Sequence, residues 1–374
     1  MTFVDADGAH SFGPANSSAA ATVQVHHPRF YRSVVSGGSL GAAESYVRGD
    51  WSCQDLTAAM RILARNQECI SKVGASRWIA PLHRFSNWLQ RNTKAGSRRN
   101  IAAHYDLSNE FFALMLDPTM TYSSGIYATA ESTLEQASRE KYDRICRQLN
   151  LQPRDHILEI GTGWGGFAVH AAKNYGCRIT TTTISQQQHD FARQRFEQAG
   201  VTDHVTLLKQ DYRDLQGHYD KLVSIEMIEA VGEKYLPKFF AQCSKLLKPN
   251  GRMALQAITM PDQRYDSYRR SVDFIRKYIF PGGFLPSLSV MSRCVGAQTD
   301  MTIVNLQDIG SHYARTLADW RHNFWANIDR VRKLGFADRF VRTWHYYLCY
   351  CEAGFAEGQI GVSQLTLAKP RGLQ

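Results

Sequence analysis

The sequence predicts an α/β protein in which a doubly wound parallel sheet follows a smaller, mainly helical N-terminal module. Segments typical of strands and of helices alternate between residues 155 and 259, and a glycine-rich turn directly follows the first strand. Strands separated by single helices form βαβ units, which build a parallel sheet. The chain of 374 residues is also longer than one domain of about 150 residues, which predicts a second module.

Short apolar or β-branched runs indicate the strands, and apolar residues at helical spacing indicate the helices. The strands are expected at 155–161, 177–185, 205–211, 220–228 and 252–259, and the helices at 165–175, 186–200 and 233–247. Because the glycine turn follows the first strand, it is expected at the carboxyl edge of the sheet, where such sheets bind ligands.

Composition divides the chain into four parts. We expect a disordered tail at 1–20, an N-terminal module at 21–90, a basic linker at 91–100 and the α/β domain at 101–374. Small and polar residues fill the tail, and RNTKAGSRRN forms the linker. The spacing of Leu56, Met60 and Leu63 predicts a helix in the N-terminal module.

The formal net charge of +10 favours an anionic partner, either a nucleic acid or a membrane surface, although it is also compatible with plain solubility. We find neither a secretory signal pattern nor an apolar run of about 18–20 residues that would span a bilayer. The eight cysteines form no CxxC pair, so no zinc ribbon or other metal site is predicted. We therefore expect a cytoplasmic protein whose membrane contact is peripheral.

The turn LEIGTGWGGFA, residues 158–168, contains GxGxxG at Gly161, Gly163 and Gly166. A P-loop is excluded because no GK[ST] follows. A dinucleotide site is disfavoured because Glu159, just before the turn, would repel a pyrophosphate, and the next strand carries no acid for the ribose. A carboxylate there suits a cation, and S-adenosylmethionine carries both an ammonium and a sulfonium group.

The other residues predicted to hold S-adenosylmethionine follow the next two strands. Hydroxyl and amide groups would hold the ribose, Asp211 would accept from the adenine amino group, and the ring of Tyr212 would stack on the base. Trp164, inside the glycine loop, either covers the cofactor or packs in the core. The ribose candidates are Thr183, Ile184 and Gln188.

The chain resembles the cyclopropane fatty acid synthase family of S-adenosylmethionine-dependent enzymes over about residues 24–370. The matching motifs are GGSLGAAESYVRGDW, HYDLSNEFFALMLDPTMTYSSGIY, LEIGTGWGG, TTTISQQQ, SIEMIEAVGEKY, DFIRKYIFPGGFLPS, HYARTLADWRHNF and YYLCYCEAGF. The resemblance implies a class I methyltransferase domain and, as substrate, a cis-unsaturated acyl chain on a membrane phospholipid. It further implies that the alkene attacks the sulfonium methyl, and that loss of a proton from the carbocation closes a cyclopropane ring.

The resemblance also assigns residues to an anion site, in which a bicarbonate ion accepts the proton. Glu229 falls on the glutamate that orients bicarbonate, Tyr313 on a tyrosine of the site, and Ile258 on a residue that contributes its backbone. Ser124 and Gln256 stand where the best-known members have cysteine and histidine, which leaves the proton acceptor and the product open. A methylene- or methyl-branched chain, formed without ring closure, is therefore the nearest alternative.

Other positions carry weaker assignments. Tyr122 and Ser123 resemble residues that contact the cofactor, although ordinary packing is an alternative. Cys351 falls on a cysteine sometimes marked as an active-site residue, or is a small buried residue. In residues 264–284, basic side chains alternate with aromatic ones, which suits a peripheral membrane enzyme. The basic residues expected at headgroups are Arg264, Arg269, Arg270, Arg276 and Lys277.

The partner expected from these observations is an unsaturated phospholipid at an anionic membrane surface, and a homodimer is a further expectation. A methyltransferase for RNA or a small molecule would use the same fold, but no NPPY-type tetrapeptide of amino-methylases follows the fourth strand, so we expect no nucleic acid partner. A lipid-binding protein without catalysis is disfavoured by the intact glycine loop together with Glu159, Glu229 and Tyr313.

Overall fold

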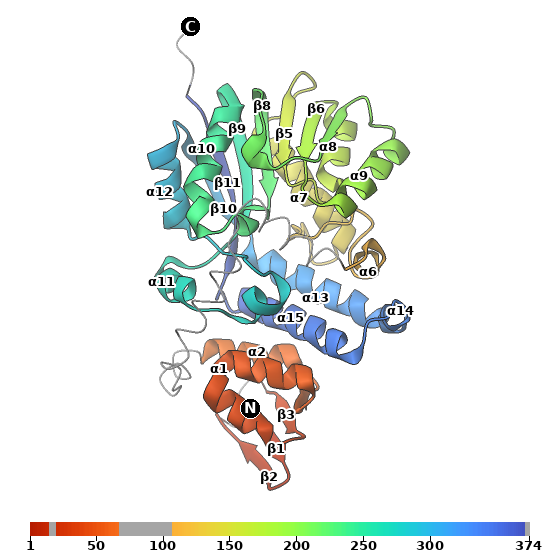
Figure 1. Ribbon diagram of the computed structural model, residues 1–374, viewed down its shortest axis with the longest axis vertical. Helices are drawn as coiled ribbons and strands as arrows, with labels where there is room; N and C mark the ends of the chain where they lie inside the picture. Colours follow the sequence, from red (N-terminus) through yellow and green to blue (C-terminus); the bar gives the residue numbers. More distant parts are fainter. Residues whose placement is uncertain (15–19, 67–106, 371–374) are drawn as a thin grey trace.

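The structure, a computed structural model, describes residues 1–14, 20–66 and 107–370. Figure 1 shows a small N-terminal module at one end and a large sheet flanked by helices at the other, with α13 and α15 between them. The predicted linker at 91–100, and residues 67–90 of the predicted N-terminal module, lie outside the described residues.

The large sheet has seven strands in the order β10-β11-β9-β8-β5-β6-β7. Its strands are β5 (His156–Ile160), β6 (Arg178–Thr182), β7 (Val205–Leu208), β8 (Tyr219–Ile225), β9 (Leu247–Thr259), β10 (Thr302–Asp308) and β11 (Gly361–Ala368). Strands β5 to β9 are parallel. The chain runs outward from β5 through β6 to β7 and then returns to β8 beside β5, so the strand order reverses between β5 and β8. In parallel sheets, ligands bind at the carboxyl ends of the strands that flank such a reversal.

Helices cover both faces of this sheet, which confirms the predicted doubly wound fold (Figure 1). One face carries α7 (Leu134–Leu149), α8 (Gly166–Tyr175) and α9 (Gln186–Ala199), and the other carries α10 (Leu236–Leu246) and α12 (Leu288–Gln298). The remaining helices of the domain are α6 (Asn109–Ala113), α11 (Asp262–Arg270), α13 (Gly310–Ala326), α14 (Ile328–Lys333) and α15 (Asp338–Ala356). Helix α9 ends at Gly200, as predicted, because its φ of 65° is in the left-handed region that favours glycine.

Two strands that the sequence did not indicate extend the sheet beyond β9. Strand β11 pairs antiparallel with both β9 and β10. Most side chains of β10 are exposed, and β11 buries Ser363, Gln364 and Thr366, so neither segment has the apolar pattern that identifies a strand. Gln364 lies opposite Gln256 of β9 in this ladder, which fixes one residue of the site described below.

The structure differs from the predicted disordered tail at residues 2–11, which form strands, while residues 15–19 of that tail lie outside the described residues. Strands β1 (Thr2–Asp5) and β2 (Gly8–Ser11) form a hairpin, and β1 also pairs with β3 (Thr22–Val25). Besides the helices α1 (Arg29–Arg48) and α2 (Leu56–Arg65), the module contains a four-stranded sheet, completed by β4 (Trp51–Cys53), that the sequence analysis did not indicate. Ala6 and Asp7 form the turn of the hairpin, and Phe3 packs it against Phe30 of α1. Helix α2 confirms the predicted helix.

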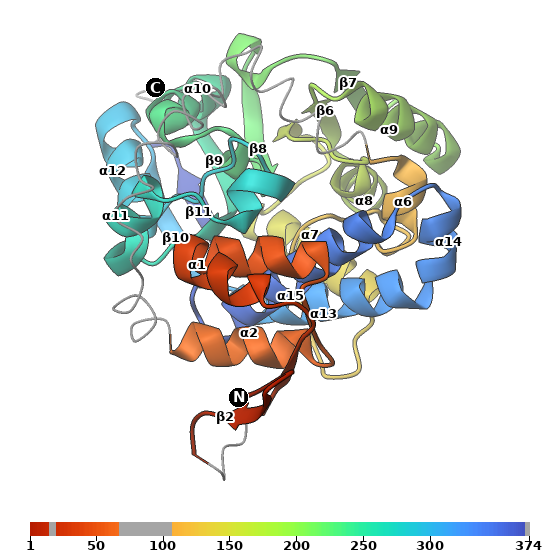
Figure 2. The same ribbon diagram turned by 60° about the horizontal axis from the view of Figure 1, so that its bottom comes forward.

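The N-terminal module packs closely against α15 (Figure 2). Arg61 and Arg65 of α2 form ion pairs with Glu357, both at 2.6 Å. Arg342 of α15 donates to the carbonyl oxygens of Tyr46 and Trp51 at 2.6 and 2.7 Å. One apolar cluster runs from this module into the α/β domain, so the two parts share a core.

Candidate active site

The glycine turn after β5 forms one wall of a cavity, and its glycines serve different purposes. Gly161 and Gly163 have φ values of 104° and 53°, which favour glycine. A Cβ atom on Gly163 would meet no protein atom within 4 Å and would project into open space, whereas one on Gly166 would lie 2.6 Å from the Tyr142 hydroxyl. Gly163 therefore keeps room for a ligand, and Gly166 allows α8 to pack closely.

The cavity has a volume of about 1150 Å³ and extends from the glycine turn to the N-terminal module. It brings together sixteen of the eighteen residues predicted for the site, which are Tyr122, Ser123, Glu159, Gly161, Gly163, Trp164, Gly166, Thr183, Ile184, Gln188, Asp211, Tyr212, Glu229, Ile258, Tyr313 and Cys351. Ser124 and Gln256 lie behind the wall, at 0% and 1% exposure. This clustering places the residues together, and their individual roles stay predictions.

On the glycine side, polar groups bond to one another around the cavity. Glu159 accepts a hydrogen bond from the Thr181 hydroxyl at 2.6 Å, and burial raises the pKa of its carboxyl to about 8. Thr183 donates to the Gln188 side chain at 2.8 Å. The Asp211 carboxylate accepts from Arg213, with N–O distances of 2.6 and 2.8 Å. Arg213, which the sequence analysis did not single out, therefore orients the carboxylate predicted to meet adenine.

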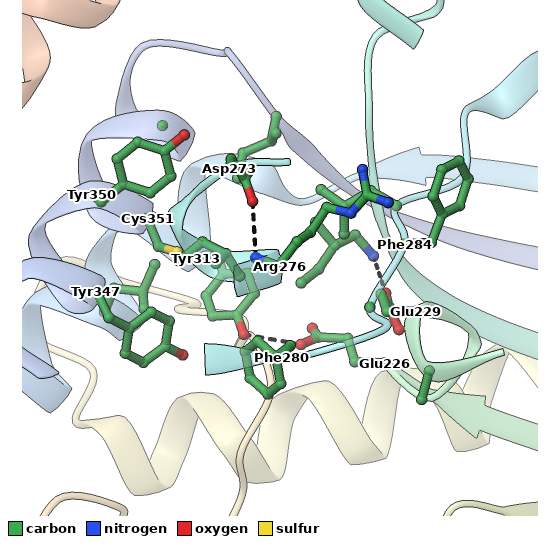
Figure 3. Close-up of a pocket in the computed structure, with 18 of the residues that line it drawn as sticks. Glu226, Glu229, Asp273, Arg276, Phe280, Phe284, Tyr313, Tyr347, Tyr350 and Cys351 are labelled. Atoms are coloured by element: carbon green, nitrogen blue, oxygen red, sulfur yellow. Dashed lines mark hydrogen bonds between the residues drawn. The ribbon is translucent and has the colours of Figure 1, made fainter. Parts of the chain in front are cut away.

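A second carboxylate, which the sequence analysis missed, lies at the carboxyl end of β8. Glu226 Oε1 accepts from the Ser124 backbone N–H at 2.9 Å and from Gln256 Nε2 at 2.8 Å. Its Oε2 accepts from the Tyr313 hydroxyl at 3.0 Å (Figure 3). Three groups predicted to surround an anion thus surround the carboxylate of Glu226.

Glu229 lies on the next turn, η3 (Ile228–Ala230), beside Glu226 (Figure 3). Its Oε1 accepts from the Ile258 backbone N–H at 2.6 Å, whereas its Oε2 is buried and has no hydrogen-bond partner among the described residues. Both glutamates line the cavity and are partly exposed to it, whereas Glu229 Oε2 itself is buried. Burial raises both pKa values, and the charge of Glu226 adds to the rise for Glu229, whose pKa reaches about 8.

A buried lysine compensates the charge of this pair. Lys141 of α7 is 0% exposed, and its Nζ donates to the Ser123 hydroxyl at 2.5 Å. Its ammonium group lowers the pKa of Glu226, while its own burial lowers the pKa of Lys141 to about 8. Lys141 occupies an apolar-stripe position of α7, together with Tyr142 and Ile145. A lone cation on such a stripe is the sequence signal that could have identified it.

Aromatic side chains close the cavity around these carboxylates. Tyr122 lies between Trp320, at a ring distance of 5.1 Å, and Phe280, at 6.3 Å, and its hydroxyl lies 2.9 Å from that of Tyr347. Tyr313 stacks on Phe355 at 4.5 Å. Such walls exclude water from the reacting groups. Cys351 joins this wall, and burial raises the pKa of its thiol, which disfavours a thiolate nucleophile there.

The basic segment divides into two groups. Arg264 and Arg276 line the cavity. Arg269 pairs with Glu233 at 3.2 Å, and Lys277 pairs with Glu44 of α1 at 2.6 Å. The N-terminal module continues the cavity with apolar side chains, which are Met1, Phe3, Val23, Phe30, Val34, Val35, Ala42, Trp51, Ala59, Met60, Leu63 and Ala64.

Comparisons with known proteins agree with this geometry. Residues 92–365 match the family described as mycolic acid cyclopropane synthetase. Tuberculostearic acid methyltransferase UfaA1 of Mycobacterium tuberculosis is 40% identical over 373 residues, covering 96% of this chain and 87% of that protein. The cyclopropane-fatty-acyl-phospholipid synthase of Escherichia coli K12 is 34% identical over 363 residues, with coverages of 95% and 89%. The crystal structure of mycolic acid cyclopropane synthase CmaA1, complexed with SAH and CTAB, superposes with a TM-score of 0.69 at 32% identity, covering 73% of this chain and 98% of that one.

The fold and the glycine-lined cavity define a class I S-adenosylmethionine-dependent methyltransferase. The chain belongs to the mycolic acid cyclopropane synthetase family, which confirms the resemblance found in the sequence. None of the helices in the described ranges is both long and apolar enough to cross a bilayer.

Proposed function

We propose that this enzyme transfers a methyl group from S-adenosylmethionine to a cis double bond in an acyl chain of a membrane phospholipid. The observation that carries the proposal is that the glycine turn and two buried carboxylates share one cavity whose other walls are apolar and aromatic. A methyltransferase for polar substrates has no need of an apolar channel continuing past the carboxylates into a second module.

The residues at the glycine turn fit the cofactor. Open space at Gly163 admits its methionine part, Glu159 suits its cationic groups, and Thr183 and Gln188 are polar partners for its ribose. S-adenosylmethionine, when bound, supplies an electrophilic methyl group. The protein's own contribution is to orient the alkene towards that methyl group and to keep water away.

The aromatic wall suits a cationic intermediate on the acyl chain. Methyl transfer leaves a carbocation, which water would trap, and the rings of Tyr122 and Phe280, which line the cavity, stabilise positive charge without reacting with it. A basic group must then remove a proton from the transferred methyl. Direct removal closes a cyclopropane ring, and we propose this product.

The second candidate product is an open chain. If a hydride shifts to the cation before the proton leaves, the same base yields a methylene branch. The 40% identity with a protein named as a tuberculostearic acid methyltransferase favours this candidate. Both products gain one CH2 over the substrate chain, so mass alone does not separate them.

The proposed substrate explains the charge of the chain. Arg264 and Arg276 line the cavity near the N-terminal module and suit an anionic headgroup. The net charge of +10 favours a peripheral encounter with the anionic inner face of the cytoplasmic membrane.

Purified protein should convert oleoyl chains in anionic phospholipid vesicles when S-adenosylmethionine is supplied. We expect a fatty acid heavier by one CH2, detected by mass spectrometry, that resists mild hydrogenation because it contains a ring. A product of the same mass that takes up hydrogen would establish the methylene-branched alternative. Absence of any mass gain with the cofactor bound would contradict the lipid proposal.

A further inference from the structure

The predicted bicarbonate site lacks available donors. Ser124 offers two donors: Glu226 accepts its backbone N–H, and the Gly125 carbonyl accepts its hydroxyl at 3.0 Å. The two side-chain hydrogens of Gln256 go to Glu226 and to the Ser124 carbonyl, and the single hydroxyl hydrogen of Tyr313 goes to Glu226. Ile258 N–H is bonded to Glu229. The residues that the family resemblance assigns to bicarbonate therefore do not fit an added anion, because two protein carboxylates already use their hydrogens.

We propose that the Glu226 carboxylate takes the place of bicarbonate and is itself the proton acceptor of the reaction. This inference rests on the proposed function. An alkene carbon forms a bond to the methyl group as the sulfonium–methyl bond breaks. A C–H bond of that methyl then breaks, its proton goes to Glu226, and its electron pair forms the third bond of the ring, or the methylene double bond after a hydride shift.

The hydrogen bonds indicate which oxygen of Glu226 accepts the proton. Oε1 accepts two hydrogen bonds, from Ser124 and Gln256, which occupy both of its lone pairs. Oε2 accepts one, from Tyr313, and keeps a lone pair. Glu226 is also on the cavity wall, so Oε2 is the oxygen that is able to react.

The backbone supports an assignment to function. Glu226 has a φ of 50°, a conformation that is uncommon for residues other than glycine, asparagine and aspartate. Its N–H donates to the Gln256 carbonyl at 2.8 Å, which fixes this conformation at the end of β8. Residues in strained backbone conformations persist where the surrounding structure holds them, and they cluster at functional sites.

Bicarbonate dependence separates this proposal from the family's bicarbonate mechanism. Wild-type turnover on oleoyl phospholipid vesicles should be the same in carbonate-free buffer as in buffer with added bicarbonate. Glu226→Gly should lose about 100-fold or more of the rate, which is the usual scale for losing a positioned base. This change frees the donors of Ser124, Gln256 and Tyr313. Added bicarbonate should therefore raise the rate of Glu226→Gly by at least tenfold.

Two further variants make the result specific. Glu226→Gln removes the basic carboxylate, so it should be inactive. Because the glutamine side chain fills the same volume, bicarbonate should not restore its rate. Glu233→Gln removes an exposed glutamate of the same segment and should behave as wild type. Thermal melting and S-adenosylmethionine affinity check the folding of each variant. A wild-type rate that falls when bicarbonate is removed would overturn the proposal, as would a fully active Glu226→Gly without bicarbonate. A wild type that methylates no lipid would instead contradict the proposed function.

Lys141 should set the pH range of this base. The titratable groups that face Glu226 are Lys141 from α7, Glu229 from η3, Tyr313 from α13 and Tyr347 from α15. Lys141 favours the ionised form of Glu226, which is the form that accepts a proton. Lys141→Met should therefore raise the pKa of Glu226 and move the acid limb of kcat/KM to higher pH by about one unit or more.

Lys173→Met, which removes an exposed lysine of α8, is the matched control and should leave the acid limb in place. Reduced turnover of Lys141→Met with an unmoved acid limb would show that Lys141 only supports the structure around Ser123.

Discussion

Valine at position 163 is expected to abolish binding of S-adenosylmethionine. Gly163 lies in the turn after β5, and a side chain there would project into the cavity rather than against protein. The branched side chain would occupy space that the ligand needs, so we expect affinity to fall by about 100-fold or more, which corresponds to roughly 2.7 kcal/mol. Isothermal titration of the purified variant with the cofactor measures this loss.

Gly200→Val is the matched control for this experiment. Gly200 has a φ of 65°, close to the 53° of Gly163, and a Cβ atom there also meets nothing within 4 Å. It lies at the end of α9, outside the cavity. The two variants share the cost of a β-branched residue in the left-handed region, about 1–3 kcal/mol of stability. Normal cofactor affinity in Gly163→Val would show that the ligand is not held at this turn.

The parallel part of the fold was predictable because each element has a local signal. Strands β5 to β8 and the second half of β9, residues 252–259, are short apolar or β-branched runs, and α8 and α9 end at glycines. Strands β10 and β11 have no such signal, since one is largely exposed and the other buries polar residues that are bonded across the sheet. The hairpin of β1 and β2 depends on contacts with α1, which local composition does not reveal.

The site was predictable where residue type and motif spacing carry the chemistry. Glu159 and the glycines follow from the turn itself. Glu226 was missed although it stands three residues before Glu229, because its role depends on which groups donate hydrogen bonds to its carboxylate. Ser124 and Tyr313 are 102 and 87 residues away from it in the chain. Without coordinates, these donors predict an anion site, and only the fold shows that a side chain of the protein occupies it.

Glutamine at position 229 is expected to lower kcat by about 10²–10⁴-fold, the range for a residue that handles a proton. Glu229 Oε2 is buried beside Glu226 and has no hydrogen-bond partner among the described residues, and its neutral carboxyl group can release its own proton as it takes up the one that Glu226 receives. The affinity for S-adenosylmethionine should be nearly unchanged, because the glycine turn and Glu159 are untouched. Turnover on lipid vesicles and cofactor titration measure the two effects separately.

Glu229→Gln removes the carboxyl proton of Glu229 and leaves the charge at this position almost unchanged at pH 7. Burial and the charge of Glu226 raise the pKa of Glu229 to about 8, so its carboxyl group is mostly neutral at pH 7. Glutamine has the same shape and charge as that neutral acid, and it still accepts the Ile258 N–H. The electrostatics around Glu226 therefore change little at pH 7, and a lost rate must come from the missing transferable proton. Above pH 8 the wild type gains a second negative charge beside Glu226, and the variant should lack any pH dependence from this ionisation. If Glu229→Gln turned over as fast as wild type, the role of Glu229 would be limited to holding Ile258 and the end of β9 in place.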